Sequence, residues 1–188
     1  MPEATSALNG REASAGAITL RDAGLVGMIT LRGNLASAKL KAAVKKAVGQ
    51  AVPEVRRMAG GLEGGAGWMS PDELLLVTAH DKAAETVAAL SAALKAEHHM
   101  AVNVSDARAV ITLRGGHAAE VLAKLAPADL DPDLFPVGEL RRTRLGQVAA
   151  AFWKSDEDTF HVICFRSVAD YVFDLLEASA KAGPVGVF

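Results

Sequence analysis

The chain has 188 residues, a formal net charge of −2 and 51% hydrophobic residues, and Cys164 is its only cysteine. This length allows one domain or two small lobes, and the composition is too apolar for a disordered chain. The balanced charge leaves no basic footprint for nucleic acid, and a single cysteine excludes a disulfide framework within the chain. No apolar run is long enough to span a membrane and the start lacks the apolar centre of a signal peptide, so we expect a soluble, cytoplasmic protein.

The first half of the chain alternates between polar connections and apolar segments. Residues 1–20 are small and polar, and they predict a flexible N-terminal segment. Apolar periodicity then predicts two strands, each followed by an amphipathic helix, in the order strand 24–31, helix 36–48, strand 74–78 and helix 82–97. The glycine-rich stretch Gly60–Gly67 predicts a mobile connecting loop before Trp68 and an acidic turn.

The second half shows a similar order of elements. Its patterns predict strand 109–113, helix 117–125, a proline-containing loop 126–138, strand 145–153, an acidic turn, strand 159–165 and helix 167–180. A tail of residues 183–188 follows.

A short repeat links the two halves. The pentapeptide ITLRG begins at Ile29 and again at Ile111, 82 positions later, and a helical pattern follows each copy. A tryptophan, an acidic turn, an apolar strand and a helix then come in the same order. We therefore predict an α+β fold of two duplicated split β-α-β type units with antiparallel sheets, over residues 21–100 and 101–182 of one compact unit. A further strand could come from around Asn103 or from the N-terminal segment.

The turn after the second ITLRG resembles a phosphate-binding loop at first sight, because two glycines separate a strand from a helix. Arg114-Gly115-Gly116 lacks the lysine and hydroxyl of a P-loop and the three spaced glycines of a dinucleotide fingerprint. The first copy, at Arg32 and Gly33, continues with different residues. We predict a structural corner, with Arg32 and Arg114 anchoring either the fold or a partner.

Other reactive side chains do not form a recognisable constellation. The histidines are scattered along the chain, at His80, His98, His99, His117 and His161. Cys164 lies in an apolar strand, where a buried and inert thiol is expected. The sequence therefore predicts no catalytic, cofactor-binding or metal-binding residue in this chain.

Two sets of side chains have open roles. Trp68 and Trp153 occupy equivalent places in the two halves and suit either a core or an interface. A short basic cluster, Arg141, Arg142 and Arg144, suits either a solvated surface or contact with an acidic partner.

Four strings occur in order along the chain: GMITLRG at 27–33, WMSPDELLL at 68–76, VSDARAV at 104–110 and RSVADYV at 166–172. Their order and spacing, over about residues 24–180, resemble the gamma subunit family of heterotetrameric sarcosine oxidase. The resemblance implies a fold similar to the folate-binding aminomethyltransferase domain of the glycine-cleavage T-protein. No functional residue of that fold can be carried over to this sequence.

The resemblance also implies a function. That family's enzyme is an αβγδ complex that oxidatively demethylates sarcosine to glycine. It implies FAD, FMN, NAD and tetrahydrofolate on the large subunits and zinc on a small one. The gamma chain is then a non-catalytic partner of the alpha, beta and delta subunits, with no nucleic-acid or membrane partner. The alternative is a stand-alone folate-binding or one-carbon-transfer protein of the T-protein type.

Overall fold

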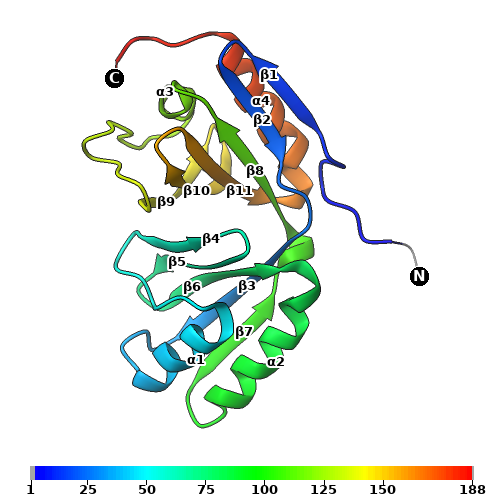
Figure 1. The fold of residues 1–188 in the computed structure, drawn as a ribbon, viewed down its shortest axis with the longest axis vertical. Helices are drawn as coiled ribbons and strands as arrows, with labels where there is room; N and C mark the ends of the chain where they lie inside the picture. The colour runs from blue at the N-terminus through cyan, green and yellow to red at the C-terminus, as the bar shows by residue number, and fades with distance from the viewer. Residues whose placement is uncertain (1–2, 188) are drawn as a thin grey trace. The chain divides into compact units, whose positions relative to one another are not determined.

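The computed structural model describes residues 3–187 and divides the chain into two compact units. The central unit spans residues 25–106, and the terminal unit combines the residues up to Gly24 with those from Ala107 onward. Both units mix helices with antiparallel sheets, which confirms the predicted α+β class (Figure 1). The central unit starts and ends a few residues later than the predicted first half, 21–100. The N-terminal residues join the predicted second half, 101–182.

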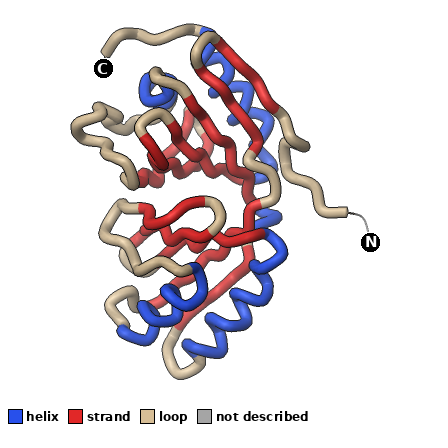
Figure 2. Tube along the Cα trace, viewed as in Figure 1, coloured by secondary structure: helices blue, strands red, loops and turns tan. Residues whose placement is uncertain are grey.

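The central unit is an antiparallel five-stranded sheet in the order β4-β5-β6-β3-β7. Its strands are β3 (Val26–Gly33), β4 (Met58–Gly61), β5 (Gly64–Ser70), β6 (Glu73–Ala79) and β7 (His99–Asn103). Two helices, α1 (Ala38–Val48) and α2 (Ala83–Leu94), lie on one face of this sheet, and the short η1 (His80–Lys82) leads into α2 (Figure 2).

The core of the central unit follows from the alternation of side chains along its strands. Ile29 and Leu31 on β3 point to the same face and pack against the helical residues Leu40 and Leu90. Each such side chain contributes about 1.5–3 kcal/mol through burial. Ser37 caps the N-terminus of α1, where its hydroxyl accepts hydrogen bonds from two backbone N–H groups of the first turn.

The terminal unit is a six-stranded sheet in the order β1-β2-β8-β11-β10-β9, again with every pair antiparallel. Its strands are β1 (Glu12–Ala15), β2 (Ile18–Asp22), β8 (Arg108–Arg114), β9 (Leu140–Leu145), β10 (Val148–Asp156) and β11 (Thr159–Phe165). Its helices are α3 (Ala118–Ala123) and α4 (Ala169–Lys181), with η3 (Arg166–Val168) before α4; η2 (Ser105–Ala107) precedes β8.

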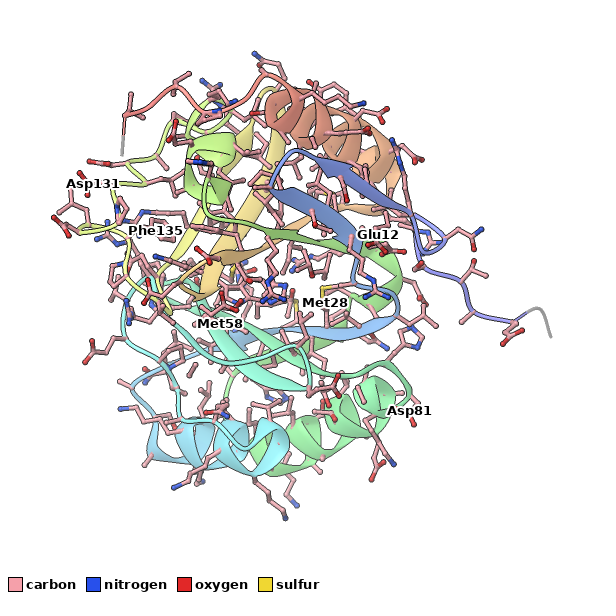
Figure 3. The ribbon with its side chains drawn as sticks, turned by 45° about the horizontal axis from the view of Figure 1, so that its top comes forward. Glu12, Met28, Met58, Asp81, Asp131 and Phe135 are labelled. Atoms are coloured by element: carbon pink, nitrogen blue, oxygen red, sulfur yellow. The ribbon has the colours of Figure 1, made fainter. Side chains whose placement is uncertain are left out.

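Aromatic side chains fill the core of the terminal unit. Phe135, labelled in Figure 3, comes from the loop before β9. Its ring lies 5.9 Å from the ring of Phe152 and 5.7 Å from that of Phe160. Leu20 of β2 and Phe173 of α4 belong to the same buried cluster. The core therefore draws residues from both ends of the chain.

A flexible stretch was expected over residues 1–20; Met1 and Pro2 lie outside the described residues, and residues 3–20 differ from that expectation. Strands β1 and β2 form a hairpin within the sheet, and Leu8 is buried in the core. The guanidinium of Arg11 lies 4.2 Å above the ring of Phe173 and 2.5 Å from a carboxylate oxygen of Asp174. Small, polar residues gave no strong periodicity, yet their partners elsewhere in the chain order them.

The glycine-rich stretch Gly60–Gly67, predicted to be a mobile loop, is instead the β4–β5 hairpin. A Cβ atom on Gly60 would lie 2.2 Å from the carbonyl oxygen of Gly64, and the φ of Gly60 is 77°. A Cβ atom on Gly65 would lie 2.7 Å from the carbonyl oxygen of Gly61. These glycines therefore permit close approach of two strands, which is one of the uses of glycine in a sheet.

The two units repeat the same order of elements, with one exchange. In the chain, the short strand β2 precedes β3, and the short strand β7 precedes β8. In space the short strands change places: β7 pairs with β3, and β2 pairs with β8. Both sources named for a further strand are thus used, one in each unit.

Matching hydrogen bonds show that β2 and β7 are equivalent. The carboxylate of Asp22 accepts from the N–H of Gly24 at 3.0 Å, and the amide oxygen of Asn103 accepts from the N–H of Ser105 at 3.0 Å. Each short strand thus ends in the same local turn. The duplication therefore includes the short strands as well as the ITLRG segments.

Candidate functional site

The Arg-Gly corner, at Arg32-Gly33 and again at Arg114-Gly115, is where the sequence first suggested a phosphate site. In the structure, each copy forms a backbone hydrogen bond to an acidic turn. The N–H of Gly115 donates to the carbonyl oxygen of Asp158 at 2.9 Å, and the N–H of Gly33 donates to that of Asp72 at 3.0 Å. A Cβ atom on Gly115 would lie 2.2 Å from the carbonyl oxygen of Ala17. The same corner thus binds the acidic turn of its own unit in both copies.

The two corner arginines face carboxylates of these turns. The guanidinium of Arg32 lies 3.4 Å from a carboxylate oxygen of Asp72 and 3.6 Å from one of Glu73. Burial acts to raise the pKa of Asp156, but hydrogen bonds and the positive charge of Arg114 outweigh it, so this pKa is lowered. Of the two roles left open for Arg32 and Arg114, these contacts support anchoring of the fold.

The histidines have separate surroundings. His80 lies 3.4 Å from Asp106, and His117 lies 3.6 Å from Glu120. His161 is placed 3.1 Å from the hydroxyl of Thr112, and burial lowers its pKa to about 4. Within residues 3–187, no group of three or more His, Cys, Asp or Glu side chains is arranged to hold a metal ion.

Cys164 is buried on β11, with its side chain in the core of the terminal unit. Burial raises the pKa of this thiol to about 11, so the thiolate is scarce at neutral pH. A nucleophilic cysteine requires the opposite shift. The geometry agrees with the inert thiol expected from the sequence.

The two tryptophans differ in burial. Trp153 is 1% exposed, and its ring lies 5.0 Å from that of His161. Trp68 is half-buried, and its backbone N–H donates to the carbonyl oxygen of Arg57. Trp153 is thus a core residue, although no residue of the described chain accepts a hydrogen bond from its indole N–H.

Two buried carboxylates that the sequence analysis did not single out hold the ends of the terminal unit. Asp22 accepts hydrogen bonds from the hydroxyl of Ser6 and from the N–H of Gly10. Glu120 accepts from the N–H groups of Val185 and Gly186, at 2.5 and 2.8 Å. Because both carboxylates accept hydrogen bonds from backbone N–H groups, Asp22 and Glu120 have structural roles. Only the pairing with distant segments reveals this, so a local motif could not have found it.

Each unit has a concave region. A cavity of about 280 Å³ in the terminal unit is bordered by residues 15–18, His117 and Lys181. A groove of about 350 Å³ in the central unit lies between α1 and α2, with Ala43, Ala47 and Leu90 among its lining residues. The groove also carries polar side chains, but Lys82 lies 3.5 Å from Glu85 and the hydroxyl of Thr86 donates to the carbonyl oxygen of Lys82, so these groups pair with one another.

The basic cluster lies on β9, at one edge of the six-stranded sheet. Arg141 forms an ion pair with Glu139, and its guanidinium lies 5.1 Å above the ring of Phe135. Arg142 and Arg144 are exposed. Arg141 therefore supports the fold.

The edge strand β7 presents a more apolar surface than the edge strand β9. Met100 and Val102 are 44% and 42% exposed, and both point away from the helical face. Strand β7 lies at the end of the five-stranded sheet, so among the described residues one side of its backbone has no neighbouring strand. Exposed apolar side chains on an unpaired edge are typical of an interaction surface.

The fold resembles that of a known transferase. The aminomethyltransferase T of the glycine cleavage system from Bartonella henselae superposes with a TM-score of 0.65 at 16% identity, over 89% of this chain and 47% of that one. The chain therefore has the fold of the T-protein aminomethyltransferase type, as predicted. Among the described residues, no helix is long and apolar enough to cross a membrane.

Sequence and structure comparisons agree on a family. The model of the sarcosine oxidase gamma subunit family matches residues 32–182. A sarcosine oxidase subunit gamma from Corynebacterium sp. (strain P-1) is 33% identical over 89% of this chain and 83% of its own length. A chain of the heterotetrameric sarcosine oxidase from Corynebacterium sp. U-96 superposes with a TM-score of 0.81 at 29% identity, over 90% of this chain and 87% of that one. The chain belongs to the sarcosine oxidase gamma subunit family.

Proposed function

We propose that this chain is the gamma subunit of a heterotetrameric sarcosine oxidase and that it acts by docking on the other subunits. The observation that carries the proposal is the match, over 90% of this chain, to a chain of a heterotetrameric sarcosine oxidase. The partners would be alpha, beta and delta subunits, and the complex would work in the cytoplasm. Its reaction would be the oxidative demethylation of sarcosine to glycine.

The internal use of the reactive side chains supports a non-catalytic role. The corner arginines face their own acidic turns, Glu120 binds backbone N–H groups, and Cys164 is a buried thiol of raised pKa. Each of these groups is occupied by the fold rather than directed at a common point. We therefore propose that FAD, FMN, NAD, tetrahydrofolate and zinc reside on other subunits.

The test is co-expression of the tagged chain with the products of neighbouring genes. We expect flavin-containing subunits to co-purify with the chain in fixed stoichiometry, and the complex to produce hydrogen peroxide when sarcosine is added. Failure to associate would overturn the proposal, and so would sarcosine turnover by the chain alone.

Titration of the isolated chain with tetrahydrofolate separates this proposal from a stand-alone folate protein. We expect no saturable heat in calorimetry, because in this proposal the folate site lies on another subunit. Saturable binding with turnover of a one-carbon donor would instead favour the T-protein type of function.

A further inference from the structure

We define the open edge of the central unit as the side of β7 (His99–Asn103) that faces away from β3. Among the described residues, no strand pairs with it. In antiparallel pairs, successive residues direct their backbone groups alternately toward and away from the neighbouring strand. The N–H of Val104 donates to the carbonyl oxygen of Met28. By this alternation, the backbone N–H and C=O groups of Val102 and Met100 also point toward β3. The backbone groups of His99, Ala101 and Asn103 therefore point outward. Within the described chain, no strand lies on that side of β7.

The open edge also lacks the features that usually prevent edge-to-edge association. Natural sheets protect their edges with charged residues, proline, bulges or a covering element. The sequence of β7 is HMAVN, with no Lys, Arg, Asp, Glu or Pro, and it exposes Met100 and Val102. By contrast, the edge strand β9 carries three arginines. A sheet edge without these features is prone to pair with a strand of another chain.

The terminal unit shows how the equivalent edge is covered. Strand β2 is the counterpart of β7, and its outward side pairs with β1 in antiparallel register. Leu20 lies opposite Leu113 as Ala101 lies opposite Leu31, and the two facing leucines are 82 positions apart, as in the repeat. Leu20 is paired with Ala13 of β1, whereas in residues 3–187 Ala101 has no such partner on its outward side. At this position the terminal sheet therefore has one strand more than the central sheet.

We propose that the open edge of β7 binds an antiparallel strand from another subunit of the complex, which completes the central sheet as β1 completes the terminal one. Apolar side chains of the added strand would cover Met100 and Val102. The nearby charge of Arg32 is already faced by Asp72 and Glu73, so an uncharged strand fits this surface best. The inference rests on the proposed docking function and names the surface that carries it out.

Strand addition depends on outward backbone donors, which a single substitution can remove. Ala101→Pro deletes the N–H that would bond to the added strand, while the ladder to β3 does not use it. We expect the affinity for the partner subunits to fall about tenfold, as for loss of one hydrogen bond. The control Ala101→Ser keeps the N–H and should bind like the wild type. Circular dichroism of both variants checks that the chain still folds.

Amide hydrogen exchange tests the geometry without any substitution. In the isolated chain, the N–H groups of Met100 and Val102 should exchange slowly and that of Ala101 quickly. In the purified complex, the N–H of Ala101 should become protected. A complex that forms while this amide still exchanges quickly would overturn the inference and leave the proposed function intact. If the wild-type chain does not associate at all, the proposed function fails instead.

The exposed apolar side chains provide an independent variant. Met100→Lys combined with Val102→Lys should abolish co-purification of the partner subunits. Val55→Lys changes another exposed valine of the same unit and should leave co-purification unchanged. If the double lysine variant retains the partner subunits as Val55→Lys does, the inference is wrong. It is also wrong if the isolated chain forms a dimer that the double lysine variant dissociates, because the edge would then bind a second copy.

Discussion

Gly115 and Gly116 are neighbours in the sequence, but the space around their α-carbons differs. A Cβ atom on Gly115 would lie 2.2 Å from the carbonyl oxygen of Ala17, and φ there is 141°; a Cβ atom on Gly116 would meet nothing within 4 Å. We predict that Gly115→Ala lowers the free energy of unfolding by about 3 kcal/mol through strain and a backbone clash. Gly116→Ala should be neutral or slightly stabilising. Urea denaturation of both variants measures this, and equal effects would show that the corner is not tightly packed.

His161 should make the stability depend on pH. Burial lowers the pKa of His161 to about 4, whereas the unfolded chain has a value near 6.5. The unfolded state therefore binds the proton first, so stability is complete above pH 6.5 and is lost as the pH falls toward 4. From pH 7 to pH 5 the loss from this group is about 2 kcal/mol.

The variant His161→Gln isolates this contribution. It removes the titrating group, so its free energy of unfolding should fall less than that of the wild type between pH 7 and pH 5. Urea denaturation at both pH values gives the two differences. Parallel losses in wild type and variant would assign the pH dependence to other groups.

At the level of elements, long segments with clear apolar periodicity were predictable from the sequence. Strands β3, β6, β8 and β11 and helices α1, α2 and α4 lie within a few residues of the predicted ranges. Their apolar faces pack against a core, so burial and local pattern agree. The shared ITLRG string also located the equivalent corners of the two units correctly.

The short strands were harder to predict, because their pairing partners are distant in the sequence. Strand β1 is made of Glu, Ala and Ser, and the β4–β5 hairpin is rich in glycine, so neither has a strong strand pattern. Strand β9 has the sequence LRRTRL, and its three arginines suggested a basic surface cluster instead of a strand. The open edge of β7 could not be predicted either, since edge status depends on the strand order of the whole sheet.

At the level of the whole chain, the exchange of β2 and β7 makes the units unequal as folding units. The central unit is continuous in sequence, and β7 is the last strand of its sheet, beside β3. The terminal unit depends on residues before Gly24, because Ile18 and Leu20 of β2 are buried in its core. A cut at the repeat boundary therefore leaves one copy with its short strand and the other without.

This asymmetry predicts different behaviour for two fragments. Residues 25–106 should fold alone and melt cooperatively. Residues 107–188 should not, because β8 lacks its neighbour β2 and the core lacks Leu20, a loss of about 2–5 kcal/mol for that side chain alone. Circular dichroism melts of the two fragments measure the difference.

A peptide of residues 1–24 provides the control for the second fragment. Added in trans, it should restore a cooperative melt to residues 107–188 by supplying β1 and β2. The same peptide with Leu20→Lys should fail, since a charge cannot occupy the core position of that leucine without a large penalty. Cooperative folding of residues 107–188 without any peptide would contradict the dependence on β2, and would mean that the core of α3, α4 and the remaining strands is sufficient by itself.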